Sequence, residues 1–432
     1  MIEKPTLNVV FVGHVDAGKS TLAGRLLNAL GTINNGIIDR LRNESTRAGM
    51  ASFLYANVLS RTKDEIKIGR TIQIAHSRAE TKHYYLNIID APVGSFMKSL
   101  IRGISQAGVA IIVLDAETGA FEAGIQSVRQ TLIMTKSMGV IQLIFCVNKM
   151  DSRFFNHSKD RFAEIKDEIT RIAKRAGYIA EPLFIPVSAW NGWNILEPAD
   201  KFSWFKGPTL LDAINALKPP TYHSEKPLRI PILEVYNLEG VGTVVFGKIE
   251  SGTLKLDTKL RFTNGKKKIT DGTVGSIEIF RKSVTEAKAG EMVSIKLENV
   301  NYQDLKAGII ISDAENNPAR EVVSFEGEIV IVKCPGVIKP SYKPTFHCYT
   351  LQTRCKFKQL LETSKMPDRS EKEENPTELR TGRFAVVLFE PDHPFYIEPF
   401  ETFPPFGRFV IRDNGHVTCV GIVKKVNYET EN

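Results

Sequence analysis

The stretch Gly13-His-Val-Asp-Ala-Gly-Lys-Ser20 has the pattern G-x-x-x-x-G-K-S, which is typical of a phosphate-binding loop. It lies between an apolar run, Leu7–Val12, that resembles a buried parallel strand and a segment, Ser20–Leu30, with leucines at helical spacing. Glycines let backbone N–H groups turn toward phosphate oxygens, and the helix N-terminus adds partial positive charge. We expect Lys19 to reach the β- and γ-phosphates and the Ser20 hydroxyl to hold Mg²⁺. The residues predicted to contact the phosphates are His14, Asp16, Ala17, Gly18, Lys19, Ser20 and Thr21.

The composition is that of a globular protein with several domains. With 432 residues, 42% of them hydrophobic and 25% charged, the chain has the length for about two to four domains. The segment Met1–Pro5 lacks the apolar core of a signal peptide, and no apolar run is long enough to predict a membrane span. Five scattered cysteines without a C-x-x-C pair favour reduced thiols in the cytoplasm. The net charge of +8 suits a polyanion such as RNA, although charge alone identifies no partner.

Strand-like and helical segments alternate in the first half of the chain. This rhythm predicts a mainly parallel sheet covered by helices on both faces, with ligands beyond the carboxyl ends of the strands. The proline-containing stretch Leu217–Pro227 indicates a linker, and short alternating runs with an Asn-Gly hairpin signal at 263–266 follow it. We therefore predict an α/β domain at 1–220 and two β-barrel domains at 226–317 and 320–432. Further strands are expected at Tyr84–Asp90, Val109–Asp115, Gln142–Asn148 and Leu183–Ser188, and helices around 95–108, 122–138 and 158–176.

Asn148-Lys-Met-Asp151 forms an N-K-x-D pattern at the end of a predicted strand, about 130 residues after the loop. The Asp151 carboxylate would accept both N–H groups of the guanine Watson–Crick edge, a pair that adenine does not offer. Asn148 would contact the base and the loop, and the Lys149 stem would cover one ring face. The alternative, in which Asn148 and Asp151 cap a helix, stays open. The residues predicted to bind the base are Asn148, Lys149, Asp151, Ser188, Ala189 and Trp190, with a backbone N–H of Ser188-Ala189 meeting the guanine O6.

Three residues are predicted to lie at the metal: Ser20, Thr71 and Asp90. Asp90 follows a strand and should reach Mg²⁺ through water. Thr71, within Ile68–Ile72, is placed to cap Mg²⁺ and the γ-phosphate when a triphosphate is bound. The predicted cofactors are therefore GTP or GDP together with Mg²⁺.

Short segments along nearly the whole chain match the pattern of one known family. In the predicted α/β domain, besides the loop and Asn148–Asp151, they are Ser52–Leu59, Gly69–Thr71, Phe121–Gly124, Trp190–Gly192, Leu196–Pro198 and Trp204–Gly207. Beyond that domain they are Lys226–Arg229, Gly242–Val244 with Gly247, Tyr342 with Pro344, Cys355 with Phe357, and Pro404–Phe409 with Arg412 and Asp413. Through these segments the chain resembles the elongation factor 1-alpha family of translational GTPases. The resemblance implies a multidomain α/β plus β fold, in which a P-loop GTPase domain with a mainly parallel sheet precedes two β-barrel domains. It also implies delivery of aminoacyl-tRNA to the ribosome as a GTP complex, with hydrolysis releasing the factor.

The second switch departs from the family pattern. Where the family has D-A-P-G-H-R-D-F, this chain has Asp90-Ala-Pro-Val-Gly-Ser-Phe96, which is one residue shorter. The family histidine that positions the attacking water has no counterpart, and Val93 stands where the γ-phosphate-sensing glycine belongs. Valine disfavours the backbone freedom that a moving switch requires. Because phosphoryl transfer depends on a positioned water, we assign no catalytic residue and expect impaired hydrolysis, as in a pseudo-GTPase.

Apolar residues replace charged or polar family residues near both switches. They either pack in a core or form a face that meets an altered, more apolar protein partner in place of the ribosome. Two functions therefore stay open: a divergent elongation factor, or a GDP/GTP-binding paralogue without translational GTPase activity that serves as a scaffold or cytoskeletal or complex-binding protein. An apolar patch at Leu132–Met134 would favour the second function. The five substituted positions are Ile66, Ile68, Leu132, Ile133 and Met134.

Overall fold

The computed structural model describes residues 4–47, 54–59, 74–92, 97–152, 157–263, 270–334 and 336–428. The chain forms two compact units, Met1–Pro220 and Thr221–Asn432. Each unit has its own hydrophobic cores. Within the described ranges, none of the helices is both long enough and apolar enough to cross a membrane.

The first unit is built on a sheet of six strands: β1 (Thr6–Gly13), β2 (Ala75–Glu80), β3 (Tyr85–Asp90), β4 (Val109–Asp115), β5 (Gln142–Asn148) and β6 (Leu183–Pro186). Their order across the sheet is β2-β3-β1-β4-β5-β6. The central strand β1 pairs in parallel with β3 and β4, and the parallel pairing continues through β5 to β6. The edge strand β2 pairs antiparallel with β3. The carboxyl ends of β1, β3, β4 and β5 therefore meet at one edge of the sheet.

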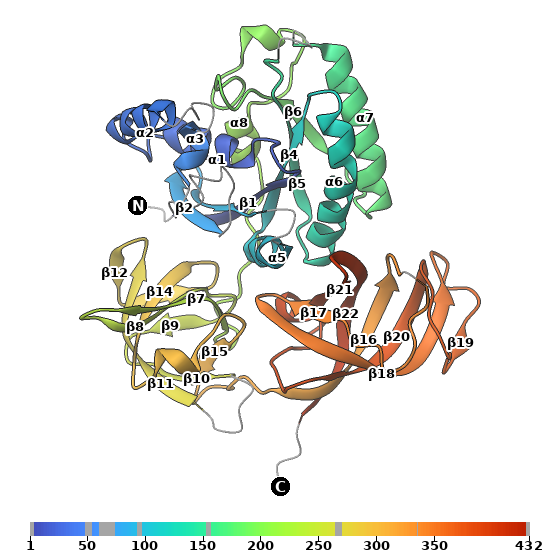
Figure 1. Ribbon diagram of the computed structural model, residues 1–432. Coiled ribbons are helices and arrows are strands. Elements are labelled where there is room, and N and C mark those ends of the chain that lie inside the picture. Colours follow the sequence, from blue (N-terminus) through green and yellow to red (C-terminus); the bar gives the residue numbers. More distant parts are fainter. Residues whose placement is uncertain are drawn as a thin grey trace. The chain divides into compact units, whose positions relative to one another are not determined.

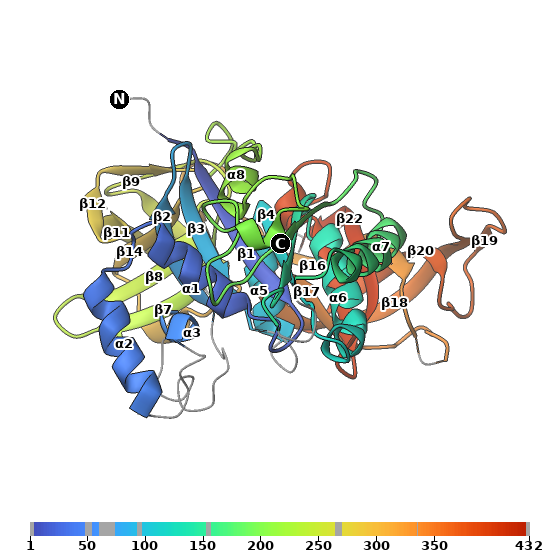
Figure 2. The ribbon, with the colours of Figure 1, turned by 90° about the horizontal axis from the view of Figure 1, so that it is seen from above.

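Helices cover both faces of this sheet, as Figure 1 shows. They are α1 (Lys19–Ala29), α2 (Asn35–Arg47), α3 (Leu54–Asn57), α5 (Met97–Gln106), α6 (Ala120–Ser137), α7 (Lys159–Arg175) and α8 (Leu210–Asn215), with a 3-10 turn η3 (Asp200–Phe202). Leu22 and Leu26 of α1 and Leu210 of α8 share a core with Val9 and Phe11 of β1. The helices α5 and α6 pack on the opposite face, and α6 lies beside α7 in both ribbon views (Figures 1 and 2). Alternate residues of β1 thus enter cores on the two faces of the sheet.

The predicted fold class, with a mainly parallel sheet under helices on both faces, is confirmed. The strands predicted at Val109–Asp115 and Gln142–Asn148 have the predicted bounds. The edge strand β2 was not predicted, because its sequence, Ala-His-Ser-Arg-Ala-Glu, lacks apolar alternation. The strand β6 ends at Pro186, and Ser188, which the prediction included, instead forms a bridge with Trp193.

The second unit begins with a closed β-barrel. The strands β10, β15, β7, β8, β14 and β11 follow one another around it, and the pairing of β10 with β11 closes the ring. The β10–β11 pairing confirms the predicted hairpin, whose turn residues lie outside the described residues. The elements of this part are β7 (Ile230–Leu238), β8 (Gly242–Lys248), β9 (Thr253–Lys255), β10 (Lys259–Phe262), β11 (Thr270–Ile279), β12 (Lys282–Val284), β13 (Glu286–Lys288), β14 (Met292–Glu298), η4 (Tyr302–Asp304) and β15 (Ile310–Asp313).

A second closed barrel completes this unit, so the predicted pair of β-barrels is confirmed. Its ring runs β17-β21-β22-β16-β20-β18 and closes through the pairing of β17 with β18. A cluster of stacked and edge-on phenylalanines, including Phe325, Phe389 and Phe409, fills its interior. The residue bounds assigned to the individual domains stay predictions. The elements are β16 (Val322–Ile331), β17 (Thr345–Cys348), β18 (Leu351–Lys365), β19 (Glu373–Glu374), β20 (Arg383–Pro391), η5 (Pro404–Phe406), β21 (Arg408–Asp413) and β22 (His416–Tyr428).

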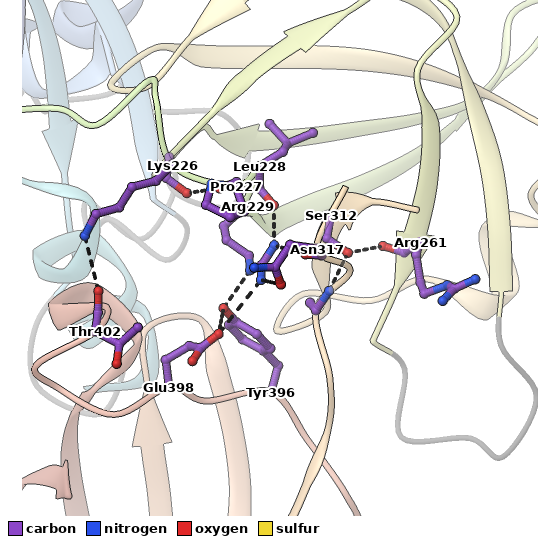
Figure 3. A network of polar contacts seen from close by, with 12 residues as sticks. Lys226, Pro227, Leu228, Arg229, Arg261, Ser312, Asn317, Tyr396, Glu398 and Thr402 are labelled. Carbon is purple, nitrogen blue, oxygen red and sulfur yellow. Dashed lines mark hydrogen bonds and ion pairs between the residues drawn. The ribbon is translucent and has the colours of Figure 1, made fainter. Parts of the chain in front are cut away.

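Arg229 joins the two barrels within the second unit. Figure 3 shows its guanidinium pointing at residues that belong to or follow both barrels. Its Nε donates to the Tyr396 hydroxyl at 2.7 Å, its Nη1 donates to the Asn317 carbonyl at 2.9 Å, and its Nη2 lies 3.9 Å from Glu398 Oε1. The residue is 4% exposed, so this cation is compensated inside the protein rather than by water.

Candidate functional site

The loop predicted to bind phosphate connects β1 to α1. Gly18, at the N-cap of α1, has a left-handed backbone with φ of 89°. A Cβ atom at this position would lie 2.3 Å from Asn148 Nδ2, so glycine is required by contact as well as by conformation. The helix α1 has no side-chain cap and no acidic residue in its first turn, and the partial positive charge of a helix N-terminus favours an anion there. Of the predicted phosphate contacts, Ala17 and Lys19 are buried, His14, Gly18, Ser20 and Thr21 are half-buried, and Asp16 is exposed.

Lys19 places a buried ammonium group beside this loop. The residue is 8% exposed, and its Nζ donates to the His14 carbonyl at 2.7 Å. Burial lowers the pKa of Lys19 to about 8, although the charges of Asp90 and Asp16 act in the opposite direction. Burial and the Lys19 charge also lower the pKa of His14, which favours the neutral form of its imidazole. An anionic ligand would stabilise the charged form of Lys19, which is the arrangement that a phosphate site requires.

Ser20 and Asp90 bring two oxygen ligands together at the same sheet edge. The Ser20 hydroxyl, in the first turn of α1, donates to Asp90 Oδ2, at the end of β3, over 2.6 Å. Asp90 is fully buried. Hydroxyl and carboxylate oxygens are ligands that Mg²⁺ prefers, so this pair fits the predicted ion. Thr71, the other predicted metal ligand, lies outside the described residues.

Asn148 connects the phosphate-binding loop to the segment that follows β6. The residue is 3% exposed and ends β5. Its Nδ2 donates to the Ala17 carbonyl at 2.9 Å, and its Oδ1 accepts from the Ala189 N–H at 2.9 Å. One of the two backbone N–H groups of Ser188-Ala189 that were predicted to meet the guanine O6, that of Ala189, therefore already donates to Asn148. The side chain acts as a bridge between three segments that are distant in sequence.

Asp151, the predicted guanine acceptor, is half-buried and stands beside the loop after β6. Its Oδ2 accepts a hydrogen bond from Asn191 Nδ2 at 3.0 Å, and the same Nδ2 lies 3.1 Å from Ser188 Oγ. The Asn191 N–H also donates to Ser188 Oγ at 3.0 Å. Trp190, which precedes Asn191, is 44% exposed. Asn191 belongs to the segment Trp190–Gly192 that resembles the family, but its contact with Asp151 was not predicted.

Lys149 is held by two carboxylates that sequence reasoning missed. Its Nζ lies 2.7 Å from Asp115 Oδ2 and 3.5 Å from Glu117 Oε2. Burial alone would lower the pKa of Lys149, but the hydrogen bond and charge of Asp115 outweigh it, so the pKa rises. Asp115 ends β4 as Asp90 ends β3 and Asn148 ends β5, and that position was the signal that could have identified it.

The apolar substitutions near the switches do not form a continuous exposed patch in α6. Leu132 and Met134 are fully buried, and Ile133 between them is half-buried. Leu132 lies one helical turn from Val128, which is also buried, so it belongs to an inward face of α6. Ile66, Ile68 and the altered second-switch residues 93–96 lie outside the described residues.

Family models match three consecutive parts of the chain. The elongation factor Tu GTP-binding domain matches residues 4–220, elongation factor Tu domain 2 matches 242–312, and the C-terminal domain of the eEF1A-like GTP-binding proteins matches 324–424. Elongation factor 1-alpha of Tetrahymena pyriformis is 38% identical over 429 residues, which cover 98% of this chain and 98% of that protein. The chain belongs to the elongation factor 1-alpha family of translational GTPases. Guanine-nucleotide binding is a property of this family.

A second relative agrees with this assignment to the elongation factor 1-alpha family, and a solved structure has the same fold. Elongation factor 1-alpha of Picrophilus torridus is 40% identical over 420 residues, with 97% of each chain covered. The crystal structure of the Saccharomyces cerevisiae Ski7 GTPase-like domain bound to GTP has a TM-score of 0.79 and 19% identity, and covers 98% of this chain and 97% of that one. At this identity the structural likeness concerns the fold alone.

Proposed function

We propose that this elongation factor 1-alpha-like protein holds GDP or GTP with Mg²⁺ at the β1–α1 loop, in the cytoplasm, and delivers aminoacyl-tRNA to the ribosome with impaired GTP hydrolysis. The bridge that Asn148 makes between Ala17 and Ala189 is the observation that carries the nucleotide site. It joins the loop proposed for the phosphates to the segment proposed for the base. The proposed contacts are His14, Asp16, Ala17, Gly18, Lys19, Ser20 and Thr21 for the phosphates, and Asn148, Lys149, Asp151, Ser188, Ala189 and Trp190 for the base.

The proposed metal ligands are Ser20 and Asp90, with Thr71 added when GTP is bound. The 2.6 Å contact between Ser20 Oγ and Asp90 Oδ2 supports the first two, because it already brings a hydroxyl and a carboxylate together. Bound there, Mg²⁺ would neutralise part of the phosphate charge. The residues of this chain bind and orient: Lys19 offers its ammonium to the phosphates, and the N–H groups at the start of α1 face them.

Impaired hydrolysis is argued from the sequence between Asp90 and Phe96. The family histidine has no counterpart there, so the side chain that orients the attacking water in the family is missing from this sequence segment. Positioning contributes a large part of the acceleration of phosphoryl transfer. The residues that bind the nucleotide are unaffected by this change, so binding and turnover should separate.

The same departure favours the second candidate, a GDP/GTP-binding paralogue that acts as a scaffold or cytoskeletal or complex-binding protein. That candidate loses one argument, because Leu132 and Met134 are buried and offer no apolar surface to a partner. The net positive charge of +8 and the two β-barrels are compatible with an RNA ligand. We therefore place the translational role first.

One set of measurements tests these proposals in order. Purified full-length protein is titrated with GDP in the presence of Mg²⁺, and binding below micromolar concentration is expected; no binding at that concentration would remove the nucleotide-site proposal. GTP-loaded protein is then assayed for retention of aminoacyl-tRNA, and retention is expected for the translational role, whereas its absence favours the paralogue. Ribosome-stimulated GTP turnover is compared with that of a family member with the histidine, and equal rates would contradict impaired hydrolysis.

A further inference from the structure

The loop after β6 contacts the proposed guanine acceptor, Asp151, through the side chain of Asn191. Asn191 Nδ2 donates to Asp151 Oδ2 at 3.0 Å and lies 3.1 Å from Ser188 Oγ. The Asn191 N–H donates to the same Ser188 oxygen at 3.0 Å, which fixes the start of the side chain. An amide donor of this kind restricts the rotation of the Asp151 carboxylate while leaving its other lone pairs able to accept further hydrogen bonds.

Arg25 of α1 holds this loop from the other side. Its Nη2 donates to the Asn191 carbonyl at 3.3 Å, and its Nη1 donates to the Tyr55 hydroxyl. The guanidinium carbon lies 4.7 Å from the centre of the Tyr55 ring. Tyr55 in turn makes an edge-on contact with Trp190, with ring centres 6.1 Å apart. One side chain thus contacts both the base loop and helix α3.

Helix α3 is a firm support for this arrangement. A Cβ atom at Gly24 would lie 2.0 Å from the Tyr55 carbonyl oxygen, so the backbone of α3 rests directly on α1 at the residue before Arg25. Tyr55 is buried and shares a small core with Leu54 and with Ile38 and Leu41 of α2. The Tyr55 hydroxyl therefore has a defined position, and it gives the Arg25 guanidinium a defined position as well.

We propose that Asn191 and Arg25 are positioning residues for guanine selection. Arg25 fixes the Asn191 loop against α1 and α3, and Asn191 aims the Asp151 carboxylate at the N1–H and 2-amino groups of the purine. The inference rests on the proposed nucleotide site and assigns to it a specificity device outside the N-K-x-D pattern. Two parallel hydrogen bonds to one carboxylate require the correct carboxylate plane, so a rotated Asp151 loses mainly the second bond.

The prediction concerns the ratio of two affinities rather than one affinity. Inosine diphosphate has the phosphates, the N1–H and the O6 of GDP but lacks the 2-amino group. A well-aimed Asp151 should bind GDP more tightly than inosine diphosphate, because the second hydrogen bond of the carboxylate is present only with GDP. A carboxylate that rotates freely should lose about tenfold of this preference, while binding of inosine diphosphate changes little.

The test uses the full chain with Mg²⁺ and measures dissociation constants for GDP and inosine diphosphate by calorimetric titration. The variants are Asn191→Ala, Asn191→Asp, Arg25→Ala and Arg25→Lys. Asn191→Asp keeps the size of the side chain but turns the donor toward Asp151 into an acceptor, so loss of preference there cannot come from a cavity. Arg25→Lys keeps the charge but cannot reach both Tyr55 and Asn191, so it should restore only part of the preference. The matched control is Arg40→Ala, which removes an arginine from the same unit whose side chain is 75% exposed.

The proposal is supported if the preference for GDP over inosine diphosphate falls about tenfold in both Asn191 variants and in Arg25→Ala, and stays unchanged in Arg40→Ala. Equal weakening of both nucleotides would assign Asn191 and Arg25 a merely structural role and overturn it. An unchanged preference in the Asn191 variants would overturn it as well. Failure of the unaltered protein to bind GDP is a different result, because it removes the nucleotide site itself. A circular dichroism spectrum of each variant identifies any that do not fold, and for Arg25 the milder Tyr55→Phe then replaces it.

Discussion

The replacement of Asn148 by alanine should weaken nucleotide binding far more than an equally destabilising change elsewhere in the first unit. The Asn148 amide makes two hydrogen bonds of 2.9 Å, one to the Ala17 carbonyl and one from the Ala189 N–H. Ala17 and Ala189 are themselves 0% and 2% exposed, so water does not readily replace the lost partner. The substitution leaves two buried backbone groups unpaired at once.

The size of the effect follows from these contacts. An unpaired buried donor or acceptor costs about 1–3 kcal/mol, so the pair costs about 2–6 kcal/mol before the loop relaxes. Relaxation and partial hydration favour the lower half of this range, and we expect a loss of about 3 kcal/mol in the free energy of unfolding. If the loosened loop must reorder when nucleotide binds, the same free energy weakens GDP binding by about 100-fold.

The assay combines thermal denaturation with calorimetric titration of GDP in the presence of Mg²⁺. Tyr178→Phe is a matched control, because the buried Tyr178 hydroxyl lies within hydrogen-bonding distance of Thr135 and Val140, at 2.9 Å from each. Val140 precedes β5, whereas Asn148 ends it, so the two substitutions act at opposite ends of one strand. GDP affinity of Asn148→Ala within threefold of the unaltered protein, with a loss of stability like that of Tyr178→Phe, would refute the bridge as a positioning device.

Three further predictions concern other parts of the molecule. The pKa of about 8 for Lys19 in the ligand-free protein predicts that GDP affinity is flat below pH 8 and falls by up to about tenfold per pH unit above it, because binding must then restore the proton. Since this pKa lies below that of an unfolded lysine, the ligand-free unit should also gain stability between pH 8 and 10.5. GDP titrations and thermal melts across pH 7–10 that show no slope would contradict both statements. Asp151→Asn should weaken GDP at least about tenfold and strengthen xanthosine diphosphate, whose C2 carbonyl accepts from the new amide; competition between the two nucleotides measures the exchange, and an unchanged order would argue against Asp151 as the base acceptor. Arg229→Ala should lower the free energy of unfolding of the second unit by about 3 kcal/mol, because it leaves Tyr396, Asn317 and Glu398 without their buried cation. The GDP affinity of this variant should be unchanged. A loss below about 1 kcal/mol in urea denaturation would show that the network contributes little to stability.

The fold was predictable because its signals are local. The runs at Val109–Asp115 and Gln142–Asn148 are apolar throughout, as strands covered on both faces must be, and the loop between β1 and α1 has a fixed residue pattern. The strand β2 lacks such a signal. It lies at the sheet edge, where one neighbour supplies the hydrogen bonds and polar residues such as His76 and Arg78 are tolerated.

The site was predictable only in part, because side-chain contacts between residues far apart in the sequence produce no recognisable spacing pattern. Lys149 lies 34 positions after Asp115, and Asn191 lies 40 positions after its partner Asp151 and far from Arg25. For Leu132 and Met134, the sequence does not decide whether the side chains are exposed or buried. Their replacement of polar family residues allowed either an exposed patch or a core, and only their burial decides for the core.

The Asn148 bridge sets the distance between the phosphate and base subsites of the proposed nucleotide site. Because one buried amide hydrogen-bonds to both Ala17 and Ala189, the two subsites are held at one separation. A ligand that carries both groups at this separation binds the second subsite at a high effective concentration. Separate guanosine and pyrophosphate lack this advantage, which for linked groups is about 10²–10⁴-fold. Small molecules designed against this protein should therefore be chosen first for a length that spans both subsites and only then for their fit to either one.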